Sequence, residues 1–265
     1  MTALGLKLLA SVFMLIDHIG YCFYGPMILR IIGRLAFPIY VFQMTEGYRH
    51  TSNRLRYAVR LAIFGLISQV PFSLMIKGVP MQWNLNVMFT LLIGYLAIWL
   101  LETLKHRAGL LALGIGIVLG VQILYFREIL QSDYGKTGIL LALAFYYLYP
   151  CRRQPEPQKP LRTHHRNQST ILLIACFLVV FSPTLIHMVG QLARALIGRS
   201  WSIDAPSPWS FAQLASLLAL PLCLAYHGSR GWTPKTKAGQ KALQFGFYAF
   251  YPVHMLILVW LKGIL

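Results

Sequence analysis

The sequence predicts an all-α, polytopic integral membrane helix bundle. Hydrophobic residues make up 57% of the 265-residue chain and charged residues only 12%, whereas a soluble domain carries about 25% charged residues. The apolar runs recur along the full length of the chain. We therefore expect a single transmembrane domain over residues 1–265 in the cell membrane, crossing it several times.

About nine segments are long and apolar enough to be transmembrane helices, which need about 20 mostly apolar residues each. They lie at approximately 4–24, 27–47, 57–76, 86–102, 109–126, 137–150, 170–191, 209–227 and 243–262. The sixth is short, and 192–208 has room for an interfacial helix. The first run contains Asp17 and His18 and lacks a cleavage site, so we do not interpret it as a signal peptide.

Loop charge predicts the orientation. Lysine and arginine gather in loops 48–56, 103–108, 151–169 and 228–242, and loops of low charge alternate with these. The positive-inside rule then places the amino terminus in the cytoplasm and makes 151–169 a basic, proline-rich cytoplasmic linker. The net charge of +17 is therefore expected to face anionic lipid rather than nucleic acid.

Two adjacent polar residues, Asp17 and His18, lie inside the first apolar segment. A carboxylate at the centre of a membrane helix costs about 2.5–3.5 kcal/mol on insertion scales. The whole chain has only seven acidic residues. A carboxylate and an imidazole inside the membrane therefore mark a candidate functional site.

A tight turn at Gly25-Pro26 predicts a hairpin between the first two segments. His18 and Arg34 then both lie about 10–12 Å below the turn, at 1.5 Å per helical residue. Arg30 and Arg34 are four apart and are expected to share a helix face. Either Asp17 and Arg34 form a structural ion pair, with His18 a hydrogen-bonded core residue, or these side chains form a reactive centre.

Four further positions carry polar groups that the membrane setting does not explain. Glu46 ends the second segment and is either a helix-end charge or a residue of the functional site. Asn86 and Thr90 share a face at i, i+4, which is also typical of interhelical hydrogen bonding. Asp133 precedes the sixth segment and has the alternative role of a helix N-cap.

The last segment contains His254 close to Pro252, in the run Phe247-Tyr-Ala-Phe-Tyr251-Pro252-Val-His254. Proline kinks a helix and frees a backbone carbonyl. Such kinks are tolerated in membrane helices where a partner or a cavity satisfies the freed group. The four cysteines have no metal-ligand spacing and imply no disulfide framework.

Several stretches along the chain match those of a known family. The chain resembles the TraX family, whose namesake is the F-pilin acetylase and which is distantly similar to the acyltransferase-three family. One departure is His227-Gly228-Ser-Arg230-Gly231, where we expect Tyr-Asn-Gly-x-Arg-Gly. The matching stretches are Met14–Gly20, Leu29–Tyr40, Glu46-Gly47, Asn86–Thr90, Asp133–Gly135 and Phe250–His254.

The resemblance implies a membrane acetyltransferase that takes an acetyl group from cytosolic acetyl-CoA. Its acceptor, a protein amine, a sugar hydroxyl or a small-molecule amine, is expected at the outer side. Acyl transfer needs a base or nucleophile and donors for the oxyanion. We expect His18, Asp17 and Arg34 as catalytic residues, Arg30, Arg34, His254 and Glu46 as cofactor-binding residues, and Asn86, Asp133 and Tyr251 as substrate-binding residues.

Two other functions fit the same residues. Intramembrane Asp, His and Arg side chains also build proton relays, so a proton-coupled transporter is one alternative. The chain shows no internal repeat, which many transporters have. The other alternative is a non-catalytic membrane partner of a pilus or secretion system, in which Asp17 and His18 would tolerate substitution.

Overall fold

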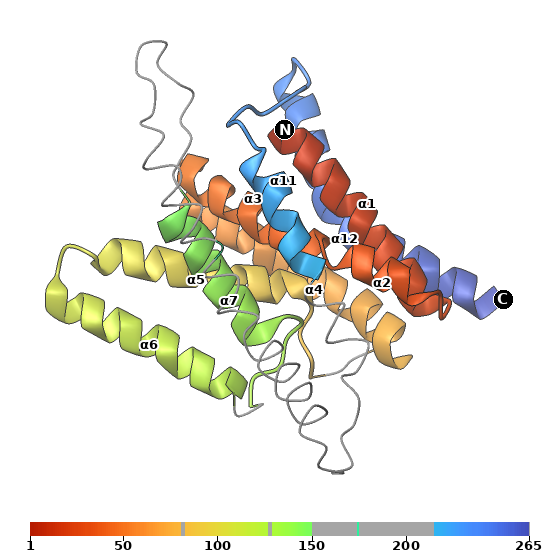
Figure 1. Cartoon of the computed structure of the whole chain (residues 1–265), viewed down its shortest axis with the longest axis horizontal. Helices are drawn as coiled ribbons and strands as arrows, with labels where there is room; N and C mark the ends of the chain where they lie inside the picture. Colours follow the sequence, from red (N-terminus) through yellow and green to blue (C-terminus); the bar gives the residue numbers. More distant parts are fainter. Residues whose placement is uncertain (81–82, 127–128, 150–173, 175–214, 265) are drawn as a thin grey trace, which may run out of the picture. The chain divides into compact units, whose positions relative to one another are not determined.

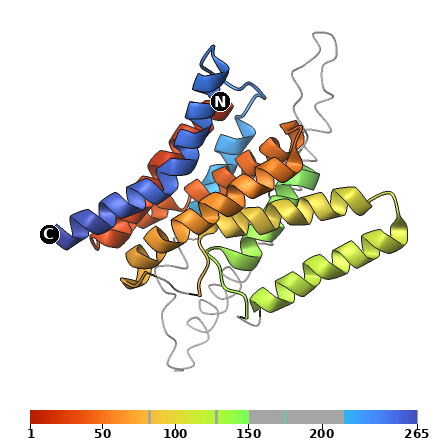
Figure 2. The same cartoon turned by 180° about the vertical axis from the view of Figure 1, so that it is seen from behind.

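The computed structural model describes residues 1–80, 83–126, 129–149, 174 and 215–264. These residues form helices joined by turns and loops, and six of the helices are long and apolar enough to cross a membrane. Their bounds confirm the all-α class and six of the predicted segments. The described chain divides into two compact units. Figures 1 and 2 show its helices from opposite sides.

The first unit holds Met1–Tyr40 and the described part of Arg152–Gly231, and the second holds Val41–Cys151 and Trp232–Leu265. The predicted segment 170–191, the linker 151–169 and the stretch 192–208 lie outside the described residues, except for Ile174. The full number of spans and the orientation therefore stay predictions. The helices are α1 (Ala3–Cys22), α2 (Met27–Gly33), α3 (Ala36–His50), α4 (Arg54–Lys77), α5 (Val87–Leu104), α6 (Ala108–Phe126), α7 (Gly135–Leu148), η1 (Ala215–Leu218), α11 (Ala219–Leu224) and α12 (Lys237–Ile264).

The predicted segment 27–47 is long and apolar enough to cross a membrane but is not one continuous helix. Helix α2 ends at Gly33, a turn covers residues 34 and 35, and α3 begins at Ala36. Pro38 lies in the first turn of α3, where its missing N–H costs no hydrogen bond. Proline is tolerated in the first turn of a helix but not in its interior, so the sequence carried a signal for this break.

Helices α1 and α2 pack side by side in the first unit (Figure 1). Gly33 permits this contact, because a Cβ atom at residue 33 would lie 2.2 Å from the Asp17 Cβ and 2.7 Å from the Asp17 Cα. Real Cβ atoms do not approach so closely. The absence of a side chain at Gly33 therefore brings the backbone of α2 against Asp17.

The start of α1 is held by the loop that follows α11. Backbone N–H groups of Ala3 and Leu4 donate to the carbonyls of Ser229 and Arg230, at 2.9 and 3.1 Å. The N–H of His227 donates to the carbonyl of Met1 at 3.2 Å. The first N–H groups of a helix have no intrahelical acceptor. This loop supplies carbonyl acceptors for two of them. Since residue 227 contributes its backbone here, the departure from the expected tyrosine leaves the contact intact.

In the second unit, α4 packs against both α5 and α12, and α5 packs against α7. Mainly aliphatic side chains, with one tyrosine, form the core between α5, α6 and α7. Leu85 and Ser132 form a parallel β-bridge that joins the loops before α5 and α7. Both loops were predicted on the outer side, so the bridge agrees with the predicted alternation. The core residues are Ala97, Leu101, Val118, Tyr125 and Ile139.

Replacing Gly33 by alanine is expected to destabilise the protein. The new methyl group collides with the Asp17 backbone, and overpacking of this kind costs about 1–3 kcal/mol. The measurement is the midpoint of thermal unfolding in detergent. Gly116→Ala is the control, because Cβ at that position in α6 meets nothing within 4 Å. Equal midpoints for the two variants would contradict the close α1–α2 contact.

Candidate functional site

The α1–α2 hairpin places Asp17 and Arg30 in direct contact. Arg30 Nη1 donates to Asp17 Oδ2 at 2.6 Å and to the Asp17 carbonyl at 2.9 Å. Only 11% of the Arg30 side chain and 14% of the Asp17 side chain are exposed. Of the two arginines that the sequence placed at the depth of Asp17, Arg30 forms the ion pair, so the alternative of an Asp17–Arg34 pair is corrected in its partner. Arg34 lies in the turn after α2 and acts on Asp17 as an electrostatic neighbour.

The ion pair has the right geometry to persist in apolar surroundings. Arg30 also places its guanidinium 5.2 Å from the centre of the Tyr21 ring, a cation–π contact. A buried charge is tolerated when it is paired and hydrogen-bonded. Asp17 thus holds Arg30 in a fixed position, and Arg34 lies close enough to interact with the same carboxylate.

His18 is half-buried and follows Asp17 in α1. Successive helical residues point about 100° apart, so the imidazole leaves the helix on a different face from the ion pair. The Asp17 carboxylate is engaged by Arg30 and orients an arginine rather than the imidazole. The structure thus brings Asp17, Arg30 and Arg34 together and places His18 on the adjoining face of α1.

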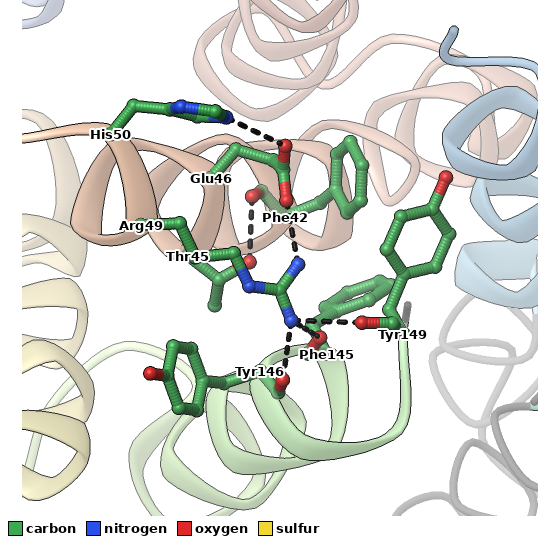
Figure 3. Close-up of polar contacts among 8 residues, drawn as sticks. All are labelled: Phe42, Thr45, Glu46, Arg49, His50, Phe145, Tyr146 and Tyr149. Atoms are coloured by element: carbon green, nitrogen blue, oxygen red, sulfur yellow. Dashed lines mark hydrogen bonds and ion pairs between the residues drawn. The ribbon is translucent and has the colours of Figure 1, made fainter. Parts of the chain in front are cut away.

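Glu46 belongs to a separate cluster in the second unit (Figure 3). It is 5% exposed, and its Oε1 accepts a hydrogen bond from Arg49 Nη1 at 2.7 Å. His50 Nε2 lies 3.7 Å from the other carboxylate oxygen. Glu46 is therefore not a solvated helix-end charge but one half of a buried ion pair.

Arg49 connects this ion pair to the end of α7. Its Nη2 donates to the backbone carbonyls of Phe145, Tyr146 and Tyr149, and its guanidinium lies 5.1 Å from the centre of the Tyr146 ring. The last carbonyls of a helix have no intrahelical partner and carry partial negative charge. Arg49 satisfies them and ties α3 to α7 (Figure 3). The carboxyl-terminal ends of α3 and α7 lead into loops 48–56 and 151–169, which were both predicted to be cytoplasmic. Their contact is compatible with that prediction.

Asn86 is fully buried and caps α5. Its Oδ1 accepts from the N–H of Met88 at 3.0 Å, and its Nδ2 donates to the Gly65 carbonyl at 2.7 Å and to Gln69 Oε1 at 2.9 Å. These bonds join α5 to α4, as the interhelical alternative anticipated. Gln69 was not predicted; only its polarity within an apolar run marks it in the sequence. A role for Asn86 in substrate binding stays a prediction.

Asp133 does not cap α7. Tyr134 occupies the N-cap position in a left-handed backbone conformation, and no side-chain cap bond is made there. Asp133 instead uses its backbone: its N–H donates to the Leu85 carbonyl at 2.9 Å, and its carbonyl accepts from the Thr90 hydroxyl. The loop and α5 are therefore held together by the main chain of Asp133.

His254 is 4% exposed within α12, and Tyr251 is equally buried. The ring nitrogen Nδ1 of His254 lies 2.6 Å from the Phe250 carbonyl, and the ring stacks on Phe250 with centres 4.7 Å apart. A carbonyl accepts only, so Nδ1 carries the proton in the neutral ring and Nε2 carries the lone pair. The imidazole is thereby held in one tautomer, as a base or hydrogen-bond acceptor.

The second unit also contains an apolar cavity of about 700 Å³ between α5, α6 and α7. None of the predicted site residues lines it. Within the described ranges, no three His, Cys, Asp or Glu side chains gather as metal ligands would. Among the described residues, the predicted polar site residues therefore lie in the α1–α2 hairpin and around α3, α5 and α12, away from this cavity.

Sequence comparisons decide the family. The family model described as TraX protein matches residues 4–262. The chain belongs to the TraX family. It is 28% identical to a protein named "Probable fimbrial assembly protein FimC, serogroup H1" from Dichelobacter nodosus, over 97% of this chain and 94% of the relative.

A more distant relative of this TraX family member is "Uncharacterized protein RP591" from Rickettsia prowazekii (strain Madrid E). It is 25% identical over 69% of this chain and 62% of the relative. No solved structure matches the chain. The TraX family match covers the hairpin and every predicted site residue, and the similarity to the acyltransferase-three family stays an expectation.

Removing the arginine of the hairpin ion pair is expected to destabilise the protein strongly. Arg30→Met leaves the Asp17 carboxylate buried without its partner, a change that costs about 3 kcal/mol or more. The double variant Asp17→Asn/Arg30→Met removes both charges and is expected to be more stable than Arg30→Met alone. Thermal unfolding in detergent measures both.

The pair Glu102–Lys105 provides the comparison, because 47% of its lysine side chain is exposed although only 13% of its glutamate side chain is. Lys105→Met is expected to change stability by less than about 1 kcal/mol, since the ammonium that is removed lies at the surface, where ion pairs contribute little. If Arg30→Met and Lys105→Met lowered the midpoint of thermal unfolding equally little, the Asp17–Arg30 pair would not stabilise the fold as its geometry indicates.

Arg49→Lys is expected to loosen α7 although the charge is kept. An ammonium group is a compact donor and does not reproduce the planar fork that contacts Glu46 and three carbonyls at once. We expect a loss of about 1–3 kcal/mol in thermal unfolding, since buried acceptors lose their donors. Arg107→Lys in the exposed loop after α5 is the matched control and is expected to be neutral. Equal stability of both variants would contradict the capping role of Arg49.

Proposed function

We propose that the protein is a membrane-embedded acetyltransferase that moves an acetyl group from cytosolic acetyl-CoA to an amine or hydroxyl acceptor. The observation that carries this proposal is the α1–α2 hairpin, with the buried Asp17–Arg30 pair, Arg34 beside it and His18 on the adjoining face. Buried ionisable groups inside a membrane are expensive and mark functional sites. Membership in the TraX family supports acyl transfer over other reactions.

The proposed chemistry assigns one role to each of these side chains. His18 takes the proton of the acceptor amine or hydroxyl, or carries the acetyl group itself. The acceptor atom bonds to the acetyl carbonyl carbon, the carbon–sulfur bond breaks, and the proton reaches the departing thiolate of coenzyme A. Arg34 and Arg30 stabilise the oxyanion that forms on the carbonyl oxygen. Asp17 holds Arg30 in place for this task.

Acetyl-CoA enters the proposal as co-substrate, not as a resident group. Arg30, Arg34 and His254 remain proposed contacts for it. Glu46 is a weaker candidate, because its carboxylate is engaged by Arg49 and repels phosphate. Tyr251 remains a proposed contact for the acceptor, while Asn86 and Asp133 already hold α5 to its neighbours.

The acceptor is proposed to be a surface polymer or its subunit, such as a pilin-like amino terminus or a glycan. The printed name of the Dichelobacter nodosus relative links that protein to fimbrial assembly. The same name favours a second candidate function, a non-catalytic membrane partner in fimbrial assembly. The two functions differ in one respect: only the enzyme needs His18.

His18→Ala is expected to abolish acetyl transfer while leaving the protein folded and inserted. The imidazole is the group in the hairpin that can act as base or acetyl carrier near neutral pH. Transfer of radiolabelled acetyl groups from acetyl-CoA to membrane acceptors measures the activity. His106→Ala, an exposed histidine after α5, is the matched control and is expected to keep full activity.

Undiminished transfer by His18→Ala would remove His18 as the catalytic group. Fimbrial assembly that persists in cells carrying His18→Ala, together with no transfer by the wild-type protein, would favour the non-catalytic partner instead.

A further inference from the structure

One face of α1 carries a line of polar side chains that leads away from His18. Lys7, Ser11 and His18 are four and seven residues apart, which places them on one face of a helix. Leu8 and Val12, which are about half exposed, lie on another face. Asp17 points about 100° away from His18, toward α2. The polar line is therefore separate from the ion pair and from the exposed apolar face.

Two contacts of α1 show which residues lie opposite these polar side chains. The Ser11 and Tyr40 hydroxyl oxygens lie 2.9 Å apart, and six residues further along α1 the Asp17 carboxylate meets Arg30. Tyr40 lies in the first two turns of α3. Ser11 and Tyr40 thus form a second polar contact inside the first unit, about 10 Å along α1 from His18 at 1.5 Å per residue.

The hydrogen bonds of this pair can be assigned. The Ser11 hydroxyl donates to the Lys7 carbonyl at 2.9 Å, so its single proton is used there. The Tyr40 hydroxyl must then donate to Ser11 Oγ. Each hydroxyl oxygen has two lone pairs, so both oxygens retain acceptor capacity after these two bonds. The pair is suited to accept N–H donors and offers no proton of its own.

We propose that the Ser11–Tyr40 pair binds the pantetheine arm of acetyl-CoA, an inference that rests on the proposed function. Pantetheine is a narrow chain with two amide N–H groups between the phosphates of coenzyme A and its sulfur. Lys7 and His18 are about 16 Å apart along α1, which matches the reach of an extended pantetheine arm. The Lys7 ammonium then lies at the phosphate end, the two hydroxyls accept from the amides, and the thioester reaches His18.

The competing explanation is that Ser11 and Tyr40 only join α1 to α3. Interhelical hydrogen bonds of this kind contribute only modestly to stability in a membrane. Loss of such a bond would weaken the binding of every ligand of the site through the fold. Loss of an amide contact would weaken only ligands that carry the arm.

The experiment compares two ligands on the full-length protein in detergent. One is coenzyme A, and the other is adenosine bisphosphate, the nucleotide part without the pantetheine arm. Tyr40→Phe removes the hydroxyl that accepts from a pantetheine amide and orients the Ser11 hydroxyl. Ser11→Ala removes the hydroxyl that pairs with Tyr40. We expect each variant to raise the Kd of coenzyme A about three- to ten-fold and to leave the Kd of adenosine bisphosphate unchanged. Tyr24→Phe, at the exposed turn of the hairpin, is the matched control and is expected to bind both ligands as the wild type does.

Two results would overturn the inference while the proposed function stands. One is an unchanged Kd of coenzyme A in both variants. The other is an equal loss for both ligands, which would show that the pair acts through the fold alone. Failure of the wild-type protein to bind coenzyme A would instead overturn the proposed function itself.

Discussion

The contact between Asp17 and Arg30 is the interaction on which the first unit depends. It places a carboxylate and a guanidinium in an apolar setting, where each is tolerated only because the other is present. Gly33 makes the contact possible by letting the α2 backbone approach Asp17. The hydrogen bonds of Ser229 and Arg230 to the start of α1 fix the same helix at its other end. The direction of His18 follows from these restraints, since it is the next residue of α1.

Part of this arrangement could be read from the sequence, because membrane insertion leaves simple patterns. Apolar length predicted the helices, and the Gly25-Pro26 turn predicted that Asp17 and Arg30 lie at similar depth. The choice between Arg30 and Arg34 could not be read in this way. Helical spacing placed both arginines on one face, and the structure keeps Arg34 in helical geometry, with its N–H bonded to the Arg30 carbonyl. Both arginines act on Asp17, and which of them forms the ion pair depends on side-chain geometry that spacing does not determine.

The contacts that sequence reasoning missed are tertiary. Arg49 was counted among the charges of a basic loop, yet it satisfies the end of α7 almost a hundred residues away. Gln69 and Tyr40 are single polar residues in apolar runs, and their partners lie on other helices. Such partners depend on which helix faces pack together, which periodicity alone does not determine. Asn86 shows the converse: its i, i+4 spacing to Thr90 indicated interhelical hydrogen bonding as one alternative, and the structure shows a cap and two bonds to α4.

These contacts divide the polar residues of the chain into two kinds. Arg49, Glu46 and Asn86 satisfy helix ends and join helices, whereas the hairpin holds charged groups that no helix end requires. We propose that the hairpin is an acyl-transfer centre for coenzyme A. A structure of the protein with coenzyme A bound tests this proposal most directly. We predict that the sulfur lies beside the His18 ring, with Arg30 or Arg34 facing the same point. Coenzyme A bound away from α1, with its sulfur remote from His18, would contradict it.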